Sequence, residues 1–367
     1  MGEMYIAGDW AMVRKDEIVD LPRDLTIHAD FLGALSERDF SEAFRAVHGL
    51  FHRIYADIAE SPAHFGLPVL RTGEAQMGPE YNEARSAADR PFYLLLYLFA
   101  CGAPEGDRFF VDVARFRRVN VGTRAVPNIA PLMEGLSRHG FAFEGLRAGS
   151  LPRGASRVAI AYPDPAVLTV LHPVAAKCHR FLENGGFARF RTWNPRLLTE
   201  PADVLSFGGG AEHVADSVRD SARREAIFAF HDEMTEKGYR CEVMHWHEGP
   251  MIRYFEPKGK GAYLFEIMKN RSDVTLRLRI RSAEACMEYL AGCPESVKEM
   301  FRRTDPGCDR RRDGTCVSST RYRYEGEEKW RCGCWGAPFF APLDPGNYPH
   351  YLALVALGKD KPKKSAG

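Results

Sequence analysis

The tightest constraint on the fold is a strict alternation of apolar and basic residues in "VTLRLRIR", residues 274–281. Successive side chains of an extended strand point to opposite faces. The apolar set is Leu276, Leu278 and Ile280, and the basic set is Arg277, Arg279 and Arg281. The apolar face needs helices packed over it, whereas the arginine face lies in solvent or forms a site. The segment therefore predicts one strand of a sheet that is covered on one side.

Three more strand-like segments precede this strand, and helical segments flank the set. The strand-like segments are "YRCEVMHWHEG", "PMIRYFEP" and "GAYLFEIMKN", and the turn "EPKGKGAY" is typical of a hairpin. A helical segment ending at Gly238 comes before them, and another, residues 282–303, comes after them. A helix, an antiparallel meander and a helix together predict an α+β domain over residues 214–303.

The N-terminal half, residues 1–205, has mainly helical patterning. Apolar residues recur at spacings of three and four from Phe40 to Ile58, which predicts an amphipathic helix with Ser36 at its N-cap. An apolar helix over residues 92–100, a strand-like "RFFVDVARF", a helix from Asn128 to His139 and two strands follow. This order of elements is typical of winged-helix domains.

The winged-helix-like order leaves two interpretations open. In a DNA-binding protein the helix from Asn128 to His139 would contact the bases in the groove. Arg138 and His139 are the only basic side chains of this helix. A groove-reading helix normally presents several polar or basic side chains. The sequence therefore favours a helical domain that uses this shape for packing over one that binds DNA.

The segment "SFGGGAEH", residues 206–213, predicts a glycine-rich linker between the two halves. A phosphate-binding loop would need a Lys-Ser or Lys-Thr pair after the glycines and a strong strand before them. The sequence has neither at this place, so we expect a flexible connection.

Four of the nine cysteines, Cys308, Cys316, Cys332 and Cys334, lie close together near the C-terminus. Structural zinc is bound by four such ligands in a tetrahedron, and a hairpin between Cys316 and Cys332 would bring the two pairs to one end. The spacing differs from the usual Cys-x2-Cys pairs, so unpaired core thiols, a redox site or another metal remain alternatives. We expect a zinc-ribbon-like module over residues 304–358, followed by a disordered basic tail, residues 359–367.

Two other groups of residues are candidate sites. His245 and His247 share one face of a predicted strand beside Glu248, which suits a second metal or an acid/base centre, although surface histidines are the more frequent case. Basic residues on the predicted sheet suit an anion or nucleic acid, although a solvated face is the more frequent case. These residues are Arg253, Lys269, Arg277 and Arg279.

The composition and the N-terminus limit the cellular setting. The formal net charge is +1, so nothing draws the whole chain to nucleic acid or membrane. The first twenty residues lack an apolar run of signal-peptide length, and "FYLLLYLFACGA" is too short to span a bilayer. We expect a cytoplasmic protein without membrane contact, in which the remaining cysteines stay reduced.

The C-terminal half resembles a group of bacterial domains. The run from "AFHDEMTEKGYRCEVMHWHEGPMIRYFEP" to "CPESVKEMF" is similar to the helix, meander and helix of YjbR-like α+β domains. The ending "CDRRRDGTC…WRCGC…PLDPGNYPHYLALVAL" resembles a cysteine-bearing module of uncharacterised bacterial proteins. The resemblance implies an architecture of about 140 residues and no activity or catalytic residue.

These observations favour a non-enzymatic protein that binds a small ligand or a protein partner and has a structural zinc site. Nucleic acid is a more specific ligand class with less support in the sequence. It would contact the winged-helix-like region and the face with Arg277 and Arg279. The rival class is a metal-dependent enzyme centred on His245, His247 and Glu248. The sequence has no nucleophile elbow, phosphate loop, dinucleotide fingerprint or zinc-protease motif to support an enzyme.

Overall fold

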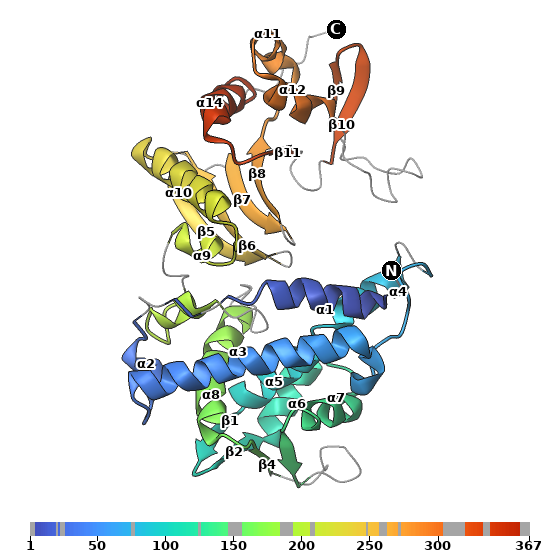
Figure 1. Cartoon of the computed structure of the whole chain (residues 1–367), viewed down its shortest axis with the longest axis vertical. Coiled ribbons are helices and arrows are strands. Elements are labelled where there is room, and N and C mark those ends of the chain that lie inside the picture. Colours follow the sequence, from blue (N-terminus) through green and yellow to red (C-terminus); the bar gives the residue numbers. More distant parts are fainter. Residues whose placement is uncertain are drawn as a thin grey trace. The chain divides into compact units, whose positions relative to one another are not determined.

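In the computed structural model, the chain forms two compact units, Met1–Gly208 and Gly209–Gly367 (Figure 1). The residues that the structure describes are 4–19, 21–22, 26–74, 78–123, 126–145, 156–183, 194–205, 210–246, 249–256, 263–270, 273–303, 320–332 and 338–359. Helices and antiparallel sheets occur in both units, which confirms the α+β class.

The N-terminal unit combines helices with one small sheet. Its helices are α1 (Ile6–Asp16), α2 (Ala29–Leu32), α3 (Glu37–Glu60), η1 (Pro62–Phe65), α4 (Pro79–Ala87), α5 (Arg90–Ala100), α6 (Val113–Thr123), α7 (Ile129–Ser137), α8 (Pro165–Glu183) and η2 (Pro195–Leu198). Its strands are β1 (Gly102–Glu105), β2 (Arg108–Asp112), β3 (Ala142–Glu144) and β4 (Arg157–Ala161).

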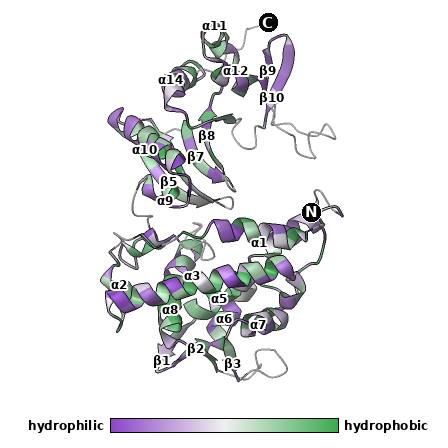
Figure 2. Cartoon of the chain, viewed as in Figure 1, coloured by the Kyte–Doolittle hydropathy of each residue, from purple (hydrophilic) through white to green (hydrophobic). Residues whose placement is uncertain are grey.

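The core of this unit forms where α3, α5 and α8 meet. The Oγ of Ser36 accepts a hydrogen bond from the Asp39 amide at 3.1 Å, so α3 begins where the sequence predicts. The apolar stripe of α3 is buried from Phe40 to Ile58. Figure 2 shows the contrast between the mixed surface of α3 and the strongly hydrophobic α5, which is buried along nearly its whole length. Burial of these apolar side chains is the main source of this unit's stability.

The sheet of the N-terminal unit has the strand order β1-β2-β4-β3, with α6 and α7 between β2 and β3 in the sequence. The predicted strand "RFFVDVARF" ends at Asp112, and its last residues form the first turn of α6. Asp112 explains the change, because its Oδ1 accepts the Arg115 amide at 2.8 Å, as a capping side chain does. The winged-helix interpretation stays a prediction.

A buried lysine ties α8 to the segment after η2. Lys177 is 1% exposed, and its Nζ donates to the carbonyl oxygens of Leu197 at 2.8 Å, Glu200 at 3.2 Å and Pro201 at 3.0 Å. Burial lowers the pKa of this ammonium group, and the carbonyl dipoles supply the acceptors that a buried cation needs.

The C-terminal unit is built around a larger sheet. Its helices are α9 (Glu212–Ala215), α10 (Ser221–Glu236), η3 (Glu284–Cys286), α11 (Met287–Ala291), α12 (Glu295–Arg302), η5 (Pro345–Asn347) and α14 (Tyr348–Leu357). Its strands are β5 (Arg240–Trp246), β6 (Gly249–Phe255), β7 (Phe265–Asn270), β8 (Asp273–Arg279), β9 (Thr320–Tyr324), β10 (Glu327–Arg331) and β11 (Pro338–Ala341).

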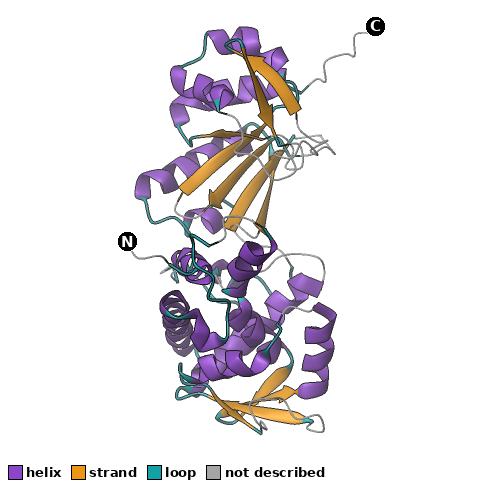
Figure 3. Ribbon diagram, turned by 90° about the vertical axis from the view of Figure 1, so that its right-hand side faces the viewer, coloured by secondary structure: helices purple, strands orange, loops and turns teal. Residues whose placement is uncertain are grey.

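The five strands β11-β8-β7-β6-β5 form an antiparallel sheet in that order, and helices cover one of its faces (Figure 3). The four predicted strands are β5 to β8, and the apolar residues of β8 face the core as the alternation predicts. The ring of Phe230 on α10 contacts Tyr254, Phe265 and Tyr348, with centroid distances of 4.9–5.8 Å. These contacts join α10, the sheet and α14 in one core.

Two predicted domain boundaries differ from the structure. β11 pairs with β8, and the Tyr322 hydroxyl donates to the Phe301 carbonyl, so residues 214–303 and 304–358 contribute to one unit. The division between the units falls within the predicted linker 206–213, but α9 begins inside that segment and His213 is fully buried. Val214 and Ala215 of α9 belong to the hydrophobic core of the second unit.

Among the described residues, no helix is both long enough and apolar enough to cross a membrane.

Candidate functional site

A cavity of about 440 Å³ in the C-terminal unit lies where β8, β11, α10 and α12 approach one another. The first residues of β8 and the chain leaving β11 form one side, and α12 forms another. The lining residues are Arg223, Val274, Thr275, Ser296, Glu299, Met300, Arg303, Phe340, Ala341, Pro342 and Leu343. Its volume lies in the range of small-molecule sites, and six of the lining residues are apolar.

The helix α12 presents one stripe of side chains to this cavity. Ser296, Glu299, Met300 and Arg303 follow at spacings of three, one and three, which places them on one helical face. Pro294 is the N-cap, and Glu295 lies in the first turn, where a negative charge stabilises the helix dipole. The helix therefore fixes two ionisable groups and a hydroxyl along the same wall.

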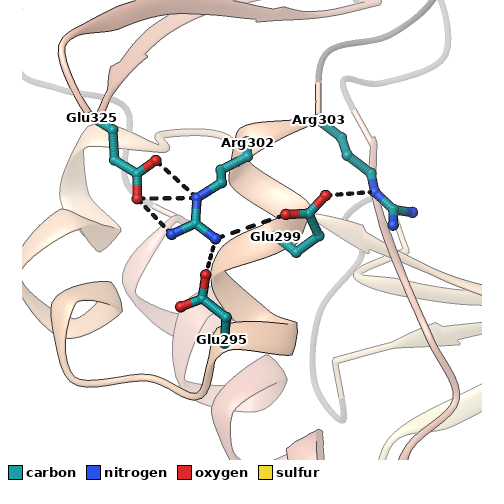
Figure 4. Close-up of polar contacts among 5 residues, drawn as sticks. All are labelled: Glu295, Glu299, Arg302, Arg303 and Glu325. Atoms are coloured by element: carbon teal, nitrogen blue, oxygen red, sulfur yellow. Dashed lines mark hydrogen bonds and ion pairs between the residues drawn. The ribbon is translucent and has the colours of Figure 1, made fainter.

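A network of ion pairs on α12 sets the charge of this wall (Figure 4). Glu299 lies between two arginines, with oxygens 3.2 Å from the Arg303 Nε and 3.8 Å from an Arg302 nitrogen. Arg302 also binds Glu295 and Glu325, and its hydrogen bonds hold the pKa of Glu325 below its usual value. Arg302 is thus occupied by carboxylates outside the cavity.

The charged side chains that line the cavity are Arg223, Arg303 and Glu299. The Arg303 side chain is 70% exposed, so its guanidinium can reorient toward a bound anion without leaving water completely. Arg223 comes from the first turn of α10, whose N-cap Asp220 accepts the Arg223 amide at 2.8 Å. The cap positions the backbone from which this arginine extends.

Two hydroxyls complete the polar part of the lining. Asn347, which is 3% exposed, exchanges hydrogen bonds with Ser296, and its Nδ2 donates to the Asp344 Oδ2 at 2.8 Å. Thr275 of β8 also lines the cavity, and the alternation along the strand places its side chain on the face of Arg277, opposite to the helices. The cavity therefore combines cationic groups and hydroxyls with an apolar wall.

The predicted basic face of the sheet contains a buried acid that the sequence analysis did not connect with it. Arg253, Glu266 and Arg277 lie opposite one another on β6, β7 and β8. The Glu266 oxygens are 2.7 Å from the Arg253 Nε and 2.9 Å from an Arg277 nitrogen, and Glu266 is 0% exposed. Both arginines bind this carboxylate, so one of their two positive charges is neutralised. We call Arg253, Glu266 and Arg277 the ionic row of this face.

Aromatic rings flank this row. The guanidinium carbons of Arg253 and Arg279 lie 4.6 Å and 5.4 Å from the Tyr263 ring centroid, and that of Arg277 lies 5.3 Å from the Phe340 centroid. Burial raises the pKa of the Tyr263 hydroxyl, and the charge of Glu266 adds to the effect. Because Phe340 also lines the cavity, it contacts both Arg277 and the ligand space.

The prediction for Lys269 needs correction. Lys269 pairs with Val274 in the register, and it is separated from Glu266 by an odd number of positions along β7. It therefore lies on the face opposite to Arg253, Arg277 and Glu266, and its exposed fraction is 5%. The prediction placed Lys269 on the same face of the sheet as the arginines, which the alternation of side chains along β7 excludes.

The predicted metal sites fall largely outside the described residues. Cys308, Cys316 and Cys334 lie there, as do His247 and Glu248, and for His245 the structure gives the backbone in β5. Cys332 follows β10 and is partly exposed. Within the described ranges, no group of three or more His, Cys, Asp or Glu residues is arranged to hold a metal ion.

The N-terminal unit contains a polar cluster that sequence reasoning missed. One Asp57 oxygen lies 2.6 Å from the His64 Nδ1, and the other lies 3.0 Å from the His139 Nε2. These residues come from α3, η1 and the turn after α7. Arg138 is close by, with its Nε 4.0 Å from Asp57. The carboxylate thus joins three segments that are distant in the sequence.

This cluster bears on the predicted DNA-reading helix. Arg138 and His139, the basic side chains that a groove-reading helix would use, both lie near Asp57. η1 packs on α7 so closely that a Cβ on Gly135 would lie 2.3 Å from the Phe65 ring. These contacts give the end of α7 a packing role, which agrees with the alternative favoured by the sequence.

No family model, curated protein or solved structure matches this chain. The resemblance to YjbR-like domains therefore stays a prediction, and the function is argued from the site.

Proposed function

We propose that the protein is a ligand-binding protein and that the cavity bounded by β8, β11 and α12 is its binding site. The observation that supports the proposal is a space of about 440 Å³ lined by six apolar residues and by five polar or charged ones. Small-molecule sites have this composition, because apolar area supplies affinity and the polar groups supply orientation.

The chemistry of the lining favours binding over catalysis. Its ionisable and hydroxyl side chains are Arg223, Arg303, Glu299, Thr275 and Ser296. A general base must be available to take a proton, but Glu299 is engaged by arginines. Activation of a hydroxyl needs an adjacent base, whereas Ser296 is bonded to the amide of Asn347.

Nucleic acid is the weaker alternative within the same class. Glu266 compensates part of the charge of Arg253 and Arg277, and Asp57 engages Arg138 and His139. Phosphate recognition depends on cations that can approach the backbone of the nucleic acid. The two predicted basic regions therefore favour a small ligand over a nucleic acid.

Filling the cavity should abolish binding. Hexanoate, hexanamide and hexylamine are probes of similar size that differ in the charge of the head group. At least one should bind the full chain with a dissociation constant of about 1 mM, which is reasonable for so few atoms. Ligand-observed NMR titration measures this, and Ser296→Phe should remove the binding because Ser296 lies on the stripe of α12 that lines the cavity.

The matched control is Thr235→Phe, which places the same ring on an exposed position of α10 outside the lining. It should bind the probes as the wild type does. If none of the three probes bound, or if Ser296→Phe bound them unchanged, the cavity would not be the site.

We also propose that Cys308, Cys316, Cys332 and Cys334 bind structural zinc in a reducing, cytoplasmic setting. The register of β9 and β10 supports this, because Thr320 pairs with Arg331 at the open end of the hairpin. Cys316 precedes that end by four residues and Cys332 follows it directly. A hairpin is a usual way to bring two ligand pairs together.

Removal of two ligands should release the metal and destabilise the C-terminal unit. Protein purified without added metal or chelator should contain about one zinc per chain, and Cys332→Ser with Cys334→Ser should lose it. Metal analysis and thermal unfolding of both proteins test this. Wild-type protein without metal, in which all four thiols react, would contradict the proposal.

A further inference from the structure

We infer that the ligand of the cavity contains an amino-acid residue in amide linkage, as in a short peptide or an N-acylated amino-acid amide, and that the backbone of Phe340 binds this residue. The inference rests on the proposed function and adds the chemical class of the ligand. Its basis is the place of the cavity at the outer edge of the sheet, beside one backbone donor and one backbone acceptor.

The cavity lies at the edge of the sheet. Val274 and Ala341 belong to the hydrophobic core that the helices cover, whereas alternation along the strands places Thr275 and Phe340 on the opposite face. All four residues line the cavity. A space that contacts both faces lies where the sheet ends, and β11 is the outer strand of this sheet in the described part of the chain.

The backbone of Phe340 points outward from this edge. On the other side of β8, toward β7, the Arg279 amide donates to the Leu264 carbonyl at 2.9 Å. Backbone groups alternate between the two sides of a strand, so β8 bonds β11 through Leu276 and Leu278. Their register partners are the residues directly before and after Phe340. The N–H and C=O of Phe340 therefore point away from β8, where the described sheet has no further strand.

Two prolines limit the outward-facing N–H groups at this end of β11 to that of Phe340. Pro338 and Pro342 hold the neighbouring outward positions, and proline has no backbone N–H. The Pro342 carbonyl already accepts the Asp344 amide at 3.0 Å and the Tyr351 hydroxyl at 3.2 Å. Prolines on an edge strand oppose the addition of a whole strand. The edge therefore suits a ligand that hydrogen-bonds at one residue, and that residue lines the cavity.

One amino-acid residue of an extended ligand has the groups that match Phe340. Its N–H and C=O can exchange two hydrogen bonds with the C=O and N–H of Phe340, as two opposite residues of an antiparallel sheet do. The apolar lining, which includes Met300 on α12 with an exposed fraction of 2%, can bury the side chain of the ligand. An L-residue and a D-residue with the same backbone bonds direct their side chains to opposite faces, so binding should depend on chirality.

The experiment is a ligand-observed NMR titration of the full chain with N-acetyl-L-leucine N′-methylamide. The comparison ligands are its D-enantiomer and the ester analogue in which an oxygen replaces the leucine N–H. We expect the L-amide to bind with a dissociation constant of about 1 mM. It should bind about twofold to tenfold more tightly than the ester, which is the effect of one net hydrogen bond, and more tightly than the D-enantiomer.

A pair of variants tests the protein side of the same contact. Phe340→Pro removes the outward N–H at an edge position that proline tolerates, and Phe340→Ala is the matched control that keeps it. Because both variants lose the ring, their comparison isolates the backbone donor. Phe340→Pro should bind the L-amide about twofold to tenfold more weakly than Phe340→Ala does. The comparison of amide and ester on the wild type needs no variant, so it decides the question even where Phe340→Pro disturbs β11.

Equal binding of the amide and the ester, or of the two enantiomers, would overturn the inference. The binding function would still stand if one of the three six-carbon probes bound the wild type and not Ser296→Phe. An L-amide that bound Ser296→Phe unchanged would lie outside the cavity, and the inference would fail in that case too. If none of the six-carbon probes bound the wild type, the proposed function itself would fail and the inference with it.

Discussion

Glu266→Gln should destabilise the C-terminal unit by about 3–5 kcal/mol, the usual cost of removing one member of a buried ion pair. Glu266 is fully buried and binds Arg253 and Arg277 on the two neighbouring strands. The neutral amide would leave Arg277, whose side chain is 10% exposed, as a buried charge without its carboxylate. The loss comes mainly from that uncompensated charge.

Urea unfolding of the full chain, combined with hydrogen exchange of peptides from β6, β7 and β8, measures the change in the right unit. Glu328→Gln is the control, because Glu328 forms a surface pair with Arg321 that is 58–68% exposed and is worth at most about 1 kcal/mol. A loss below about 1 kcal/mol for Glu266→Gln would contradict the role assigned to the buried pair.

A triple replacement separates the cost of the charge from the loss of packing. Replacing the three residues together by Arg253→Met, Glu266→Leu and Arg277→Met removes every charge of the row. Buried ionic groups exchanged for apolar ones of similar volume often leave stability unchanged or raise it. The triple variant should therefore be more stable than Glu266→Gln, although it has lost more hydrogen bonds.

The ionic row of Arg253, Glu266 and Arg277 shows which features of the sheet the sequence predicts. Alternation in β8 correctly assigned Leu276 and Leu278 to the core and Arg277 to the other face. An acid in the middle of the apolar segment "YLFEIMKN" was a visible signal for a buried pair. The pairing of Glu266 with Arg253 and Arg277 depends on the register between the strands. Turn geometry and the packing of the buried face determine this register together.

The cavity had no local signal of any kind. Its lining runs from Arg223 to Leu343, and the residues become neighbours when α10, α12 and β11 pack on one sheet. The spacing of the lining residues on α12 predicts that they share one helical face. The sequence does not predict which residues of α10, β8 and β11 lie across the cavity from them. β11 itself was hidden in a segment expected to belong to a separate zinc module, because pairing over about 60 residues leaves no periodicity in the sequence.

The Asp57 cluster escaped prediction for a different reason. Each of its residues has an ordinary structural explanation when its own segment is considered alone. Asp57 is one acid on an amphipathic helix, and His139 ends a helix for which the sequence favours a packing role over DNA binding. The contact between them joins positions 82 residues apart. The contact between His139 and Asp57 depends on pH, because the pKa values of both groups are lowered in the folded chain.

Acid should therefore loosen η1 and the end of α7 from α3 before it affects the rest of the N-terminal unit. Burial opposes ionisation of Asp57, but the hydrogen bonds and charges of His64 and His139 outweigh it and lower its pKa. Burial also lowers the pKa of His139, and its hydrogen bond to Asp57 does not fully offset this. Both groups thus bind protons more readily in the unfolded chain than in the folded one.

The sign of the pH dependence follows from these two shifts. A group with a lowered pKa in the folded state stabilises that state above its unfolded pKa, and the contribution falls as the pH drops through the folded value. For His139 the loss begins below about pH 6.5, and for Asp57 it begins below about pH 4. Stability of this contact should therefore decrease in two steps on acidification and should not recover at lower pH.

Hydrogen exchange of the full chain between pH 7 and pH 3, corrected for the intrinsic pH dependence of exchange, measures this opening in peptides that cover α7 and η1. Asp57→Asn should already raise their exchange at pH 7, with a loss of about 1.5–3 kcal/mol for the charged hydrogen bonds, and should flatten the step below pH 4. The matched change Asp39→Asn, at the exposed start of α3, should leave both peptides unchanged. If the Asp57→Asn variant kept the wild-type step below pH 4, that step would belong to another carboxylate and Asp57 would be no more than a packing residue.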